Sequence, residues 1–162
     1  MAWNNCCGPI RRPASIAIFC LPILFAQGSS HLTVGVVRKV EGKRNAAVVA
    51  RIPVTVEAGY HVNSNAPMDE YLIPLKVSWT ALGALQGGEL VYPKATVEKY
   101  EFADKPLSVF TGSFEIAASF KVAAGAPAGP GIAAGKLSYQ ACNTKMCFRP
   151  ATVEISVPYQ VD

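Results

Sequence analysis

Charged side chains are scarce in this sequence. Asp, Glu, Lys and Arg make up 16% of its 162 residues, against about 25% in an average soluble domain, which excludes a disordered, strongly charged chain. Lys and Arg exceed Asp and Glu by only 15 to 11, and no dense basic run is present, so we expect no nucleic-acid partner. Glycines and prolines are scattered without a three-residue period, which excludes a collagen-like chain.

The sequence also lacks an apolar run long enough to span a membrane. The run within residues 14–26 has an apolar core of about 12 residues, and a transmembrane helix needs roughly 20. Arg11 and Arg12 precede this run and the small Ala26 ends it, which is the layout of a secretory signal peptide. We therefore predict a signal peptide over residues 1–26 and a mature domain over residues 27–162. The mature chain is expected to be exported, to the periplasm or as a secreted protein, without stable membrane insertion.

Cysteines are few once the signal peptide is removed. Cys6, Cys7 and Cys20 would leave with it, so that only Cys142 and Cys147 remain. A single cysteine pair in an exported chain lies in a compartment where it can be oxidised.

Helical periodicity is a further absence, because no stretch of the mature chain carries a convincing apolar stripe with the helical repeat. Val-, Thr- and aromatic-rich runs alternate with period two instead, which is typical of half-buried strands. Roughly seven to nine short strands favour an all-β, immunoglobulin-like β-sandwich, with a small barrel as the competing architecture. Strands are predicted over residues 31–41, 46–57, 75–80, 89–91, 96–102, 113–122, 136–142 and 153–157.

Glycine, proline and asparagine mark the predicted turns. Residues 42–45 and 83–88 are predicted to be hairpin loops, and residues 125–135 a loop with too little bulk to pack. Residues 59–70, GYHVNSNAPMDE, form a polar segment that leaves a strand. Its Asn and Asp side chains either cap their own backbone or form the wall of a functional site.

Cys142 and Cys147 flank a predicted four-residue hairpin loop. Directly opposed residues of a hairpin have Cα atoms roughly 4.5–5.5 Å apart, which is within disulfide range. Strand alternation puts Cys142 on the polar face with Gln140, and Cys147 on the face that carries Lys145 and Arg149. Both cysteines are therefore predicted to face outward.

The pair has two interpretations, a structural staple or a redox pair. Closing a loop of about six residues stabilises a fold by only roughly 2 kcal/mol, and a domain of this size buries a sufficient core without it. Outward placement would give a partner thiol access, and Lys145 and Arg149 would favour the thiolate of Cys147. The C-x₄-C spacing excludes a thioredoxin-type site. A metal site of Cys142, Cys147 and His61 would lack a fourth ligand, so neither a metal nor another cofactor is expected.

Residues 139–142, YQAC, followed by Cys147 and Pro150, resemble a known active-site hairpin. It belongs to the N-terminal periplasmic domain of DsbD-type thiol:disulfide interchange proteins. Upstream, GYHVNSNAP and DEYLIPLKVSW resemble versions of that domain in many bacterial exported proteins, and the resemblance covers about residues 34–160. Some members of this family have five residues between the two cysteines, where this chain has four.

The resemblance implies an immunoglobulin-like fold whose Cys142–Cys147 pair shuttles electrons, with Cys147 acting toward partners. It implies thioredoxin-like periplasmic proteins as partners, together with a membrane-embedded electron donor. Since the sequence ends at Asp162 without a transmembrane block or a C-x-x-C domain, the donor is expected on another chain. The family's cap loop should fall within residues 92–102. We expect the following side chains to line or tune the site: Tyr60, His61, Gln140, Lys145, Phe148 and Arg149.

Two function classes stay open. In the first, the domain is a periplasmic thiol:disulfide interchange component, of protein-disulfide reductase type, that passes reducing equivalents to or from partner proteins. In the second, it is a non-enzymatic secreted β-sandwich binding or adapter domain with a structural hairpin disulfide. The redox potential of the cysteine pair distinguishes the two classes.

Overall fold

The computed structural model describes residues 31–162, so the predicted signal peptide over residues 1–26 lies outside the described residues. The described residues form twelve strands and no helix. The strands are β1 Leu32–Val34, β2 Val40–Gly42, β3 Ala47–Val56, β4 His61–Asn63, β5 Lys76–Ala81, β6 Leu85–Val91, β7 Thr96–Glu98, β8 Leu107–Phe110, β9 Ser113–Val122, β10 Gly129–Tyr139, β11 Ala141–Cys142 and β12 Ala151–Val161.

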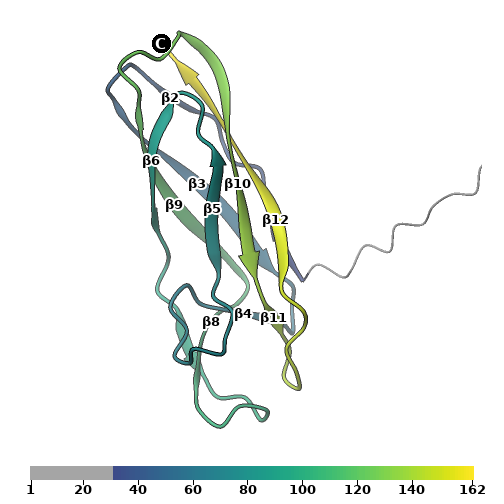
Figure 1. Cartoon of the computed structure of the whole chain (residues 1–162). Coiled ribbons are helices and arrows are strands. Elements are labelled where there is room, and N and C mark those ends of the chain that lie inside the picture. Colours follow the sequence, from purple (N-terminus) through teal and green to yellow (C-terminus); the bar gives the residue numbers. More distant parts are fainter. Residues whose placement is uncertain (1–30) are drawn as a thin grey trace, which may run out of the picture.

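Two four-stranded sheets form an elongated sandwich (Figure 1). Their strand orders are β1-β3-β9-β6 and β2-β12-β10-β5, and each pairing is antiparallel except that of β2 with β12. A third sheet, β11-β4-β8-β7, lies at the end of the sandwich opposite the C-terminus, which is the lower end in Figure 1. The predicted all-β, immunoglobulin-like sandwich is confirmed, and the sheets do not close into the competing barrel.

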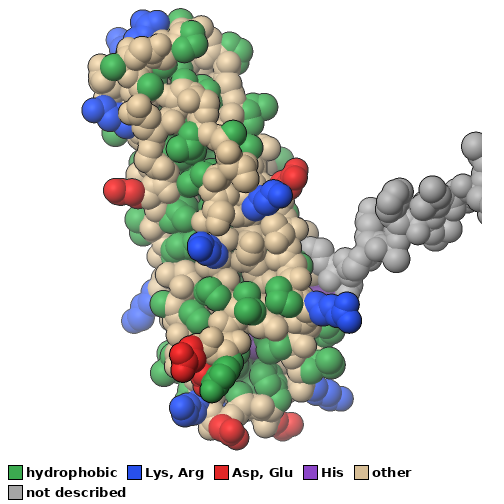
Figure 2. All heavy atoms as spheres, in the orientation of Figure 1, with side chains coloured by type: hydrophobic (Ala, Val, Ile, Leu, Met, Phe, Trp, Pro, Cys, Tyr) green, Lys and Arg blue, Asp and Glu red, His purple; other side chains and the backbone are tan. Residues whose placement is uncertain are grey.

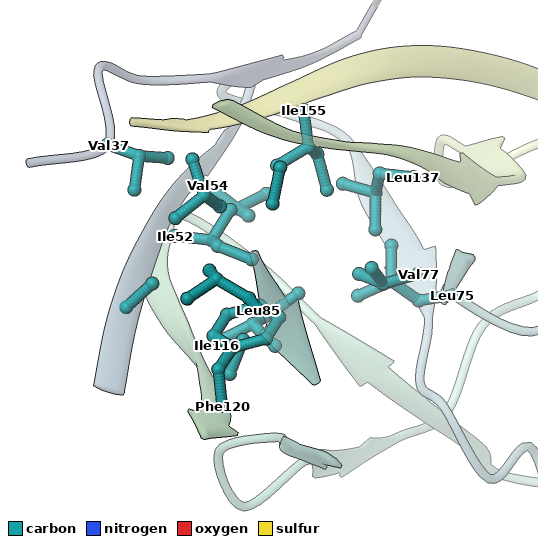
Figure 3. Close-up of a cluster of buried hydrophobic side chains, with 14 of the residues drawn as sticks. Val37, Ile52, Val54, Leu75, Val77, Leu85, Ile116, Phe120, Leu137 and Ile155 are labelled. Atoms are coloured by element: carbon teal, nitrogen blue, oxygen red, sulfur yellow. The ribbon is translucent and has the colours of Figure 1, made fainter. Parts of the chain in front are cut away.

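The core lies between the two long sheets and is built by strand alternation. Along β3, and along β9 from Ile116 onward, every second side chain is buried, and Ile52 lies directly opposite Ile116. Figure 3 shows these two side chains facing Leu137 and Ile155 of the other sheet. Burying one such side chain stabilises the fold by about 1.5–3 kcal/mol. The sandwich therefore has a core that does not depend on the cysteines.

The predicted loop over residues 125–135 is wrong from Gly129 onward, because Gly129 begins the long strand β10. Its small residues make room for large neighbours. A Cβ on Gly131 would lie 2.2 Å from the Tyr159 ring, and one on Gly135 would lie 2.8 Å from Trp79. Glycine within a strand often marks such a close approach, and here it was mistaken for loop composition.

Two further predicted loops need correction. Most of the segment 83–88 belongs to β6, where Gly87 and Gly88 adopt positive φ at an irregularity of the β6–β9 register. Such a bulge is a feature of strands rather than of hairpin loops. The turn at residues 42–45 joins β2 and β3, which belong to different sheets, so it is not a hairpin loop.

Two strands of the third sheet were not predicted. The sequence interpretation treated residues 59–70 as a loop, but β4 lies within them, and β8 was missed altogether. The predicted strand over residues 31–41 divides into β1 and β2, and that over residues 96–102 shortens to β7. Strands of three or four residues are too short for alternation to reveal them.

Candidate functional site

The cysteine hairpin begins where the chain passes from one sheet to another. Tyr139 pairs with Ala151 in the sandwich, whereas Cys142 pairs with His61 of β4 in the third sheet. Only Gln140 separates the two strands. Both residues of β11 are buried, so the alternation of buried and exposed side chains ends there, and Cys142 is completely buried, at 0% exposure. Its predicted outward placement is wrong, while Cys147 is half-buried.

The opposed pairing of the cysteines is confirmed. Cys142 and Cys147 form a β-bridge and a disulfide with a Cα–Cα distance of 3.9 Å, closer than expected for an opposed pair. The Asn143 amide donates to the Met146 carbonyl at 2.9 Å. Asn143 Oδ1 also accepts hydrogen bonds from the amides of Lys145 and Met146, at 2.8 and 2.9 Å. The predicted four-residue loop is thus held by one asparagine side chain.

His61 lies on the other side of Cys142 from Cys147. Directly opposed residues of neighbouring strands point to the same face of a sheet, so Cys147, Cys142 and His61 form a row on one face. The His61 side chain is buried, and the Tyr100 ring stacks on it with a centroid distance of 3.9 Å. Phe102 lies next to Tyr100, with 5.7 Å between the ring centroids. The predicted cap segment, residues 92–102, thus contributes Tyr100 and Phe102 beside His61.

The surroundings of His61 favour neutral groups. Burial lowers the pKa of His61 below its ordinary value, and the negative charge of Glu98 partly offsets this shift. The Tyr100 hydroxyl donates to Glu98 Oε2 at 2.6 Å. Burial, followed by this hydrogen bond, raises the pKa of Tyr100. Both the imidazole and the phenol are therefore uncharged near neutral pH.

Among the described residues, two buried side-chain polar atoms have no hydrogen-bond partner, and both belong to β4. They are His61 Nε2 and Asn63 Oδ1. An unpartnered buried polar group costs about 1–3 kcal/mol, so its presence needs an explanation. Here both atoms lie in the strand that pairs with the cysteine strand β11.

A second aromatic cluster holds the return limb of the hairpin. Phe148, which follows Cys147, packs against His31 and Tyr60 with centroid distances of 4.9 and 5.8 Å. His31 and Tyr60 are stacked at 3.7 Å, and His31 Nδ1 lies 2.7 Å from Glu57 Oε2. The structure therefore brings Tyr60 against the return limb of the hairpin, and the predicted role of Tyr60 and Phe148 in the site stays a prediction.

Gln140 links the hairpin to β4. Its Nε2 donates to the Phe148 carbonyl at 3.0 Å, and its Oε1 accepts from Asn63 Nδ2 at 3.4 Å. Asn63 Nδ2 also donates to the Ile73 carbonyl at 3.0 Å. The sequence interpretation singled out Gln140, and it placed Asn63 in the segment that either caps its own backbone or forms the wall of a site. It did not assign Tyr100 or His31 to the site. Tyr100 could have been found from its position in the predicted cap segment.

Lys145 and Arg149 are both exposed. Their proposed influence on the Cys147 thiolate stays a prediction.

Figure 2 shows that charged side chains of both signs and hydrophobic side chains share the end of the molecule that carries the third sheet.

Two hollows lie at this end of the molecule. A cavity of about 290 Å³ is bordered by Tyr60, His61, Glu98 and Tyr100 and by Thr144 of the hairpin loop. A separate groove of about 350 Å³ is lined in part by the exposed side chains of Met68, Tyr71 and Phe102. Within residues 31–162, no group of three or more His, Cys, Asp or Glu side chains is arranged to hold a metal ion. The same residues contain no helix long and apolar enough to cross a membrane.

A family model supports the resemblance that the hairpin residues suggested. The model described as "Thiol:disulfide interchange protein DsbD, N-terminal" matches residues 32–158, nearly all of the part that the structure describes. No curated protein matches the sequence.

Solved structures show similarity at the level of the fold. The N-terminal periplasmic domain of ScsB from Proteus mirabilis matches with a TM-score of 0.50 and 12% identity, over 78% of this chain and 43% of that chain. The chain thus spans less than half of that relative. The DsbD N-terminal domain of Neisseria meningitidis, in its reduced form, matches with a TM-score of 0.43 and 17% identity, over 68% and 77%. A type I cohesin from Pseudobacteroides cellulosolvens gives 0.46 and 14%, over 81% and 92%.

Proposed function

Because this chain belongs to the family of DsbD N-terminal thiol:disulfide interchange domains, we propose that its Cys142–Cys147 pair exchanges disulfides with partner proteins. In this role the pair carries two electrons. The reduced dithiol gives them to a partner disulfide, and a donor dithiol restores them.

The observation that supports this function is the unequal burial of the two cysteines. Cys142 is completely buried, whereas Cys147 is half-buried at the return of the hairpin. A partner sulfur therefore reaches Cys147 first. The Cys147 thiolate attacks the partner disulfide, forms a mixed disulfide and releases one partner thiolate. Cys142 then attacks Cys147 Sγ, which restores the internal disulfide and releases the second partner thiolate.

We propose partners of two kinds. Thioredoxin-like periplasmic proteins exchange disulfides with the domain, and a membrane-embedded donor supplies it with electrons. The apolar groove with Met68, Tyr71 and Phe102 offers contact area at the same end of the molecule as the hairpin. We propose that the mature domain lies in the periplasm, because the predicted signal peptide would export it and its proposed partners are periplasmic. The ScsB relative is itself described as a periplasmic domain.

Trapping of the mixed disulfide tests this assignment. Cys142→Ser removes the resolving thiol, so this variant should accumulate a covalent complex with a thioredoxin-like protein on a non-reducing gel. The matched variant Cys147→Ser should trap little, because its remaining thiol is the buried one. Equal trapping by both, or trapping by Cys147→Ser alone, would refute the roles, and no trapping by either would refute exchange.

One observation favours the second candidate, an adapter domain with a structural disulfide. Complete burial of Cys142 is typical of inert cysteines. Under that interpretation the double variant Cys142→Ala, Cys147→Ala keeps all binding to its partner. Under disulfide exchange, the same variant loses every covalent complex and all electron transfer.

A further inference from the structure

The burial of Cys142 makes deprotonation of its thiol difficult. To resolve a mixed disulfide it must lose its proton, because the thiolate and not the thiol is the nucleophile. Burial disfavours the charged form and raises the pKa of a thiol. With 0% of its surface exposed, Cys142 has no direct contact with bulk water that could take the proton. A group inside the protein has to accept it.

We propose that His61 is the proton acceptor for Cys142 during resolution, an inference that rests on the exchange function proposed above. His61 is the residue directly opposite Cys142 in the β4–β11 pairing. Cβ atoms of such pairs are about 4.5–5.5 Å apart and point to the same face. The imidazole therefore lies on the same side of the third sheet as the sulfur.

The free nitrogen of His61 supports this role. Nε2 is buried and has no hydrogen-bond partner in the structure of the disulfide form, so it is available to accept a proton once Cys142 carries one. The shift described above keeps the imidazole neutral near pH 7. The stacked Tyr100 ring holds the imidazole plane, and the Tyr100 hydroxyl is engaged by Glu98.

The charged and titratable groups around His61 come from three parts of the chain. Glu98 ends β7 and Tyr100 follows it, and Cys142 lies in β11. Glu57 and Tyr60, from the turn before β4, border the same cavity as His61. The remaining neighbour in the sheet, β8, has the sequence LSVF and contributes no titratable side chain. Glu98 would stabilise the imidazolium that forms when the Cys142 proton arrives.

The proposed step is balanced. The proton of the Cys142 thiol passes to His61 Nε2, and the resulting thiolate attacks Cys147 Sγ. A new Cys142–Cys147 bond forms as the bond between Cys147 and the partner sulfur breaks. The partner leaves as a thiolate with the electron pair of that bond, and the imidazolium later returns its proton to the leaving thiolate or to water. In the reverse direction, the imidazolium protonates Cys142 as it leaves.

The step can be isolated with the reduced protein and 5,5′-dithiobis(2-nitrobenzoate), an aromatic disulfide. Attack by Cys147 releases a first thionitrobenzoate at a rate proportional to reagent concentration. Resolution by Cys142 releases a second one at a rate that is independent of that concentration. Stopped-flow absorbance follows the two phases separately.

His61→Phe keeps an aromatic ring against Tyr100 but removes the base. We expect its second phase to slow by about 100-fold or more at pH 7, the usual contribution of a general base, with the first phase unchanged. Its remaining rate should rise about tenfold per pH unit, following the thiolate fraction. Lys121→Ala, on the exposed face of β9 in the sandwich body, is the control and should leave both phases unchanged.

His61→Ala provides a second test, which distinguishes a proton acceptor from a residue that only supports the structure. It enlarges the existing cavity next to His61, so added imidazole should restore the second phase of His61→Ala and not that of His61→Phe. Equal second phases in the wild type and His61→Phe, or no rescue by imidazole, would overturn the role of His61 while leaving disulfide exchange intact. Absence of a second phase in the wild type would overturn exchange itself, and the inference with it.

Discussion

The sandwich body and the third-sheet end of this molecule differ in what they bury. Between the two long sheets the buried side chains are apolar, as Ile52, Ile116, Leu137 and Ile155 illustrate (Figure 3). The buried polar residues of the described chain lie elsewhere, next to the cysteine hairpin or in β4 and the residue after it. They are His31, His61, Asn63 and Ser64.

This contrast separates stability from chemistry. The body gains its stability from apolar burial, which needs no particular partner. The hairpin end holds a buried cysteine, a buried histidine with a free nitrogen and two aromatic clusters. Unpartnered buried polar groups lower stability. They occur at the hairpin end, and the apolar core of the body provides the stability that offsets them. Changes in the body should therefore affect unfolding, and changes at the end should affect exchange.

The largest expected loss of stability comes from the body. Ile116→Ala removes a completely buried side chain opposite Ile52, so the free energy of unfolding should fall by about 2–5 kcal/mol in urea titrations. Lys121→Ala, exposed on the same strand, is the control and should change it by less than about 0.5 kcal/mol. If the two variants were equally stable, the core would not be where the structure puts it. The folded fraction of Ile116→Ala should still form mixed disulfides at the normal rate.

Removing the disulfide should have a smaller effect. In the double variant Cys142→Ala, Cys147→Ala, the free energy of unfolding should fall by only about 2 kcal/mol, since the closed loop is short. Thermal melts should show a cooperative transition well above room temperature. If the double variant were unfolded at room temperature, the fold would depend on the disulfide. The claim that the body provides the stability without the hairpin would then be wrong.

A weaker effect still is expected in the hairpin loop. Asn143→Ala loses the side-chain oxygen that accepts two backbone hydrogen bonds, so stability should fall by about 1 kcal/mol. Amide hydrogen exchange at Lys145 and Met146 should become faster at the same time. Thr144→Ala, on the exposed neighbouring residue, should leave both amides protected. Unchanged exchange in Asn143→Ala would mean that its side chain does not hold the loop.

The smallest difference should appear in the pH dependence of stability. Burial lowers the pKa of folded His61, with partial compensation by Glu98, so the unfolded chain binds a proton more readily than the folded one. The wild type should therefore lose stability as the pH falls from the unfolded value near 6.5 toward the lowered folded pKa. His61→Phe should show a shallower loss in urea titrations across this range. A steeper loss in the variant would contradict the assigned direction.

The body was largely predictable from the sequence, because one buried face imposes alternation. Residues 113–122 were predicted as a strand with the boundaries that β9 has. The start of β10 was not, because its glycines and alanines accommodate Tyr159 and Trp79 from other strands. That reason is tertiary, and local composition suggests only a loop.

The pairing of the cysteines was predictable, but the burial around them was not. The spacing of the cysteines predicted their opposed pairing. The family resemblance predicted Tyr60 beside them, and the Tyr60 ring packs against Phe148; its role in the site stays a prediction. Cys142 belongs to β11 of the third sheet, where both residues of the strand are buried, and alternation within one strand cannot reveal this. The stacking of Tyr100 on His61 joins segments that are distant in sequence, so no local pattern records it.

The measurement that tests the central claim most directly is the equilibrium between the Cys142–Cys147 disulfide and its dithiol. The purified domain is equilibrated in redox buffers of known potential, alkylated, and quantified by mass. Our account predicts a reduction potential within the range of exchange proteins, roughly −120 to −270 mV. A potential below about −300 mV, typical of structural disulfides, would contradict it.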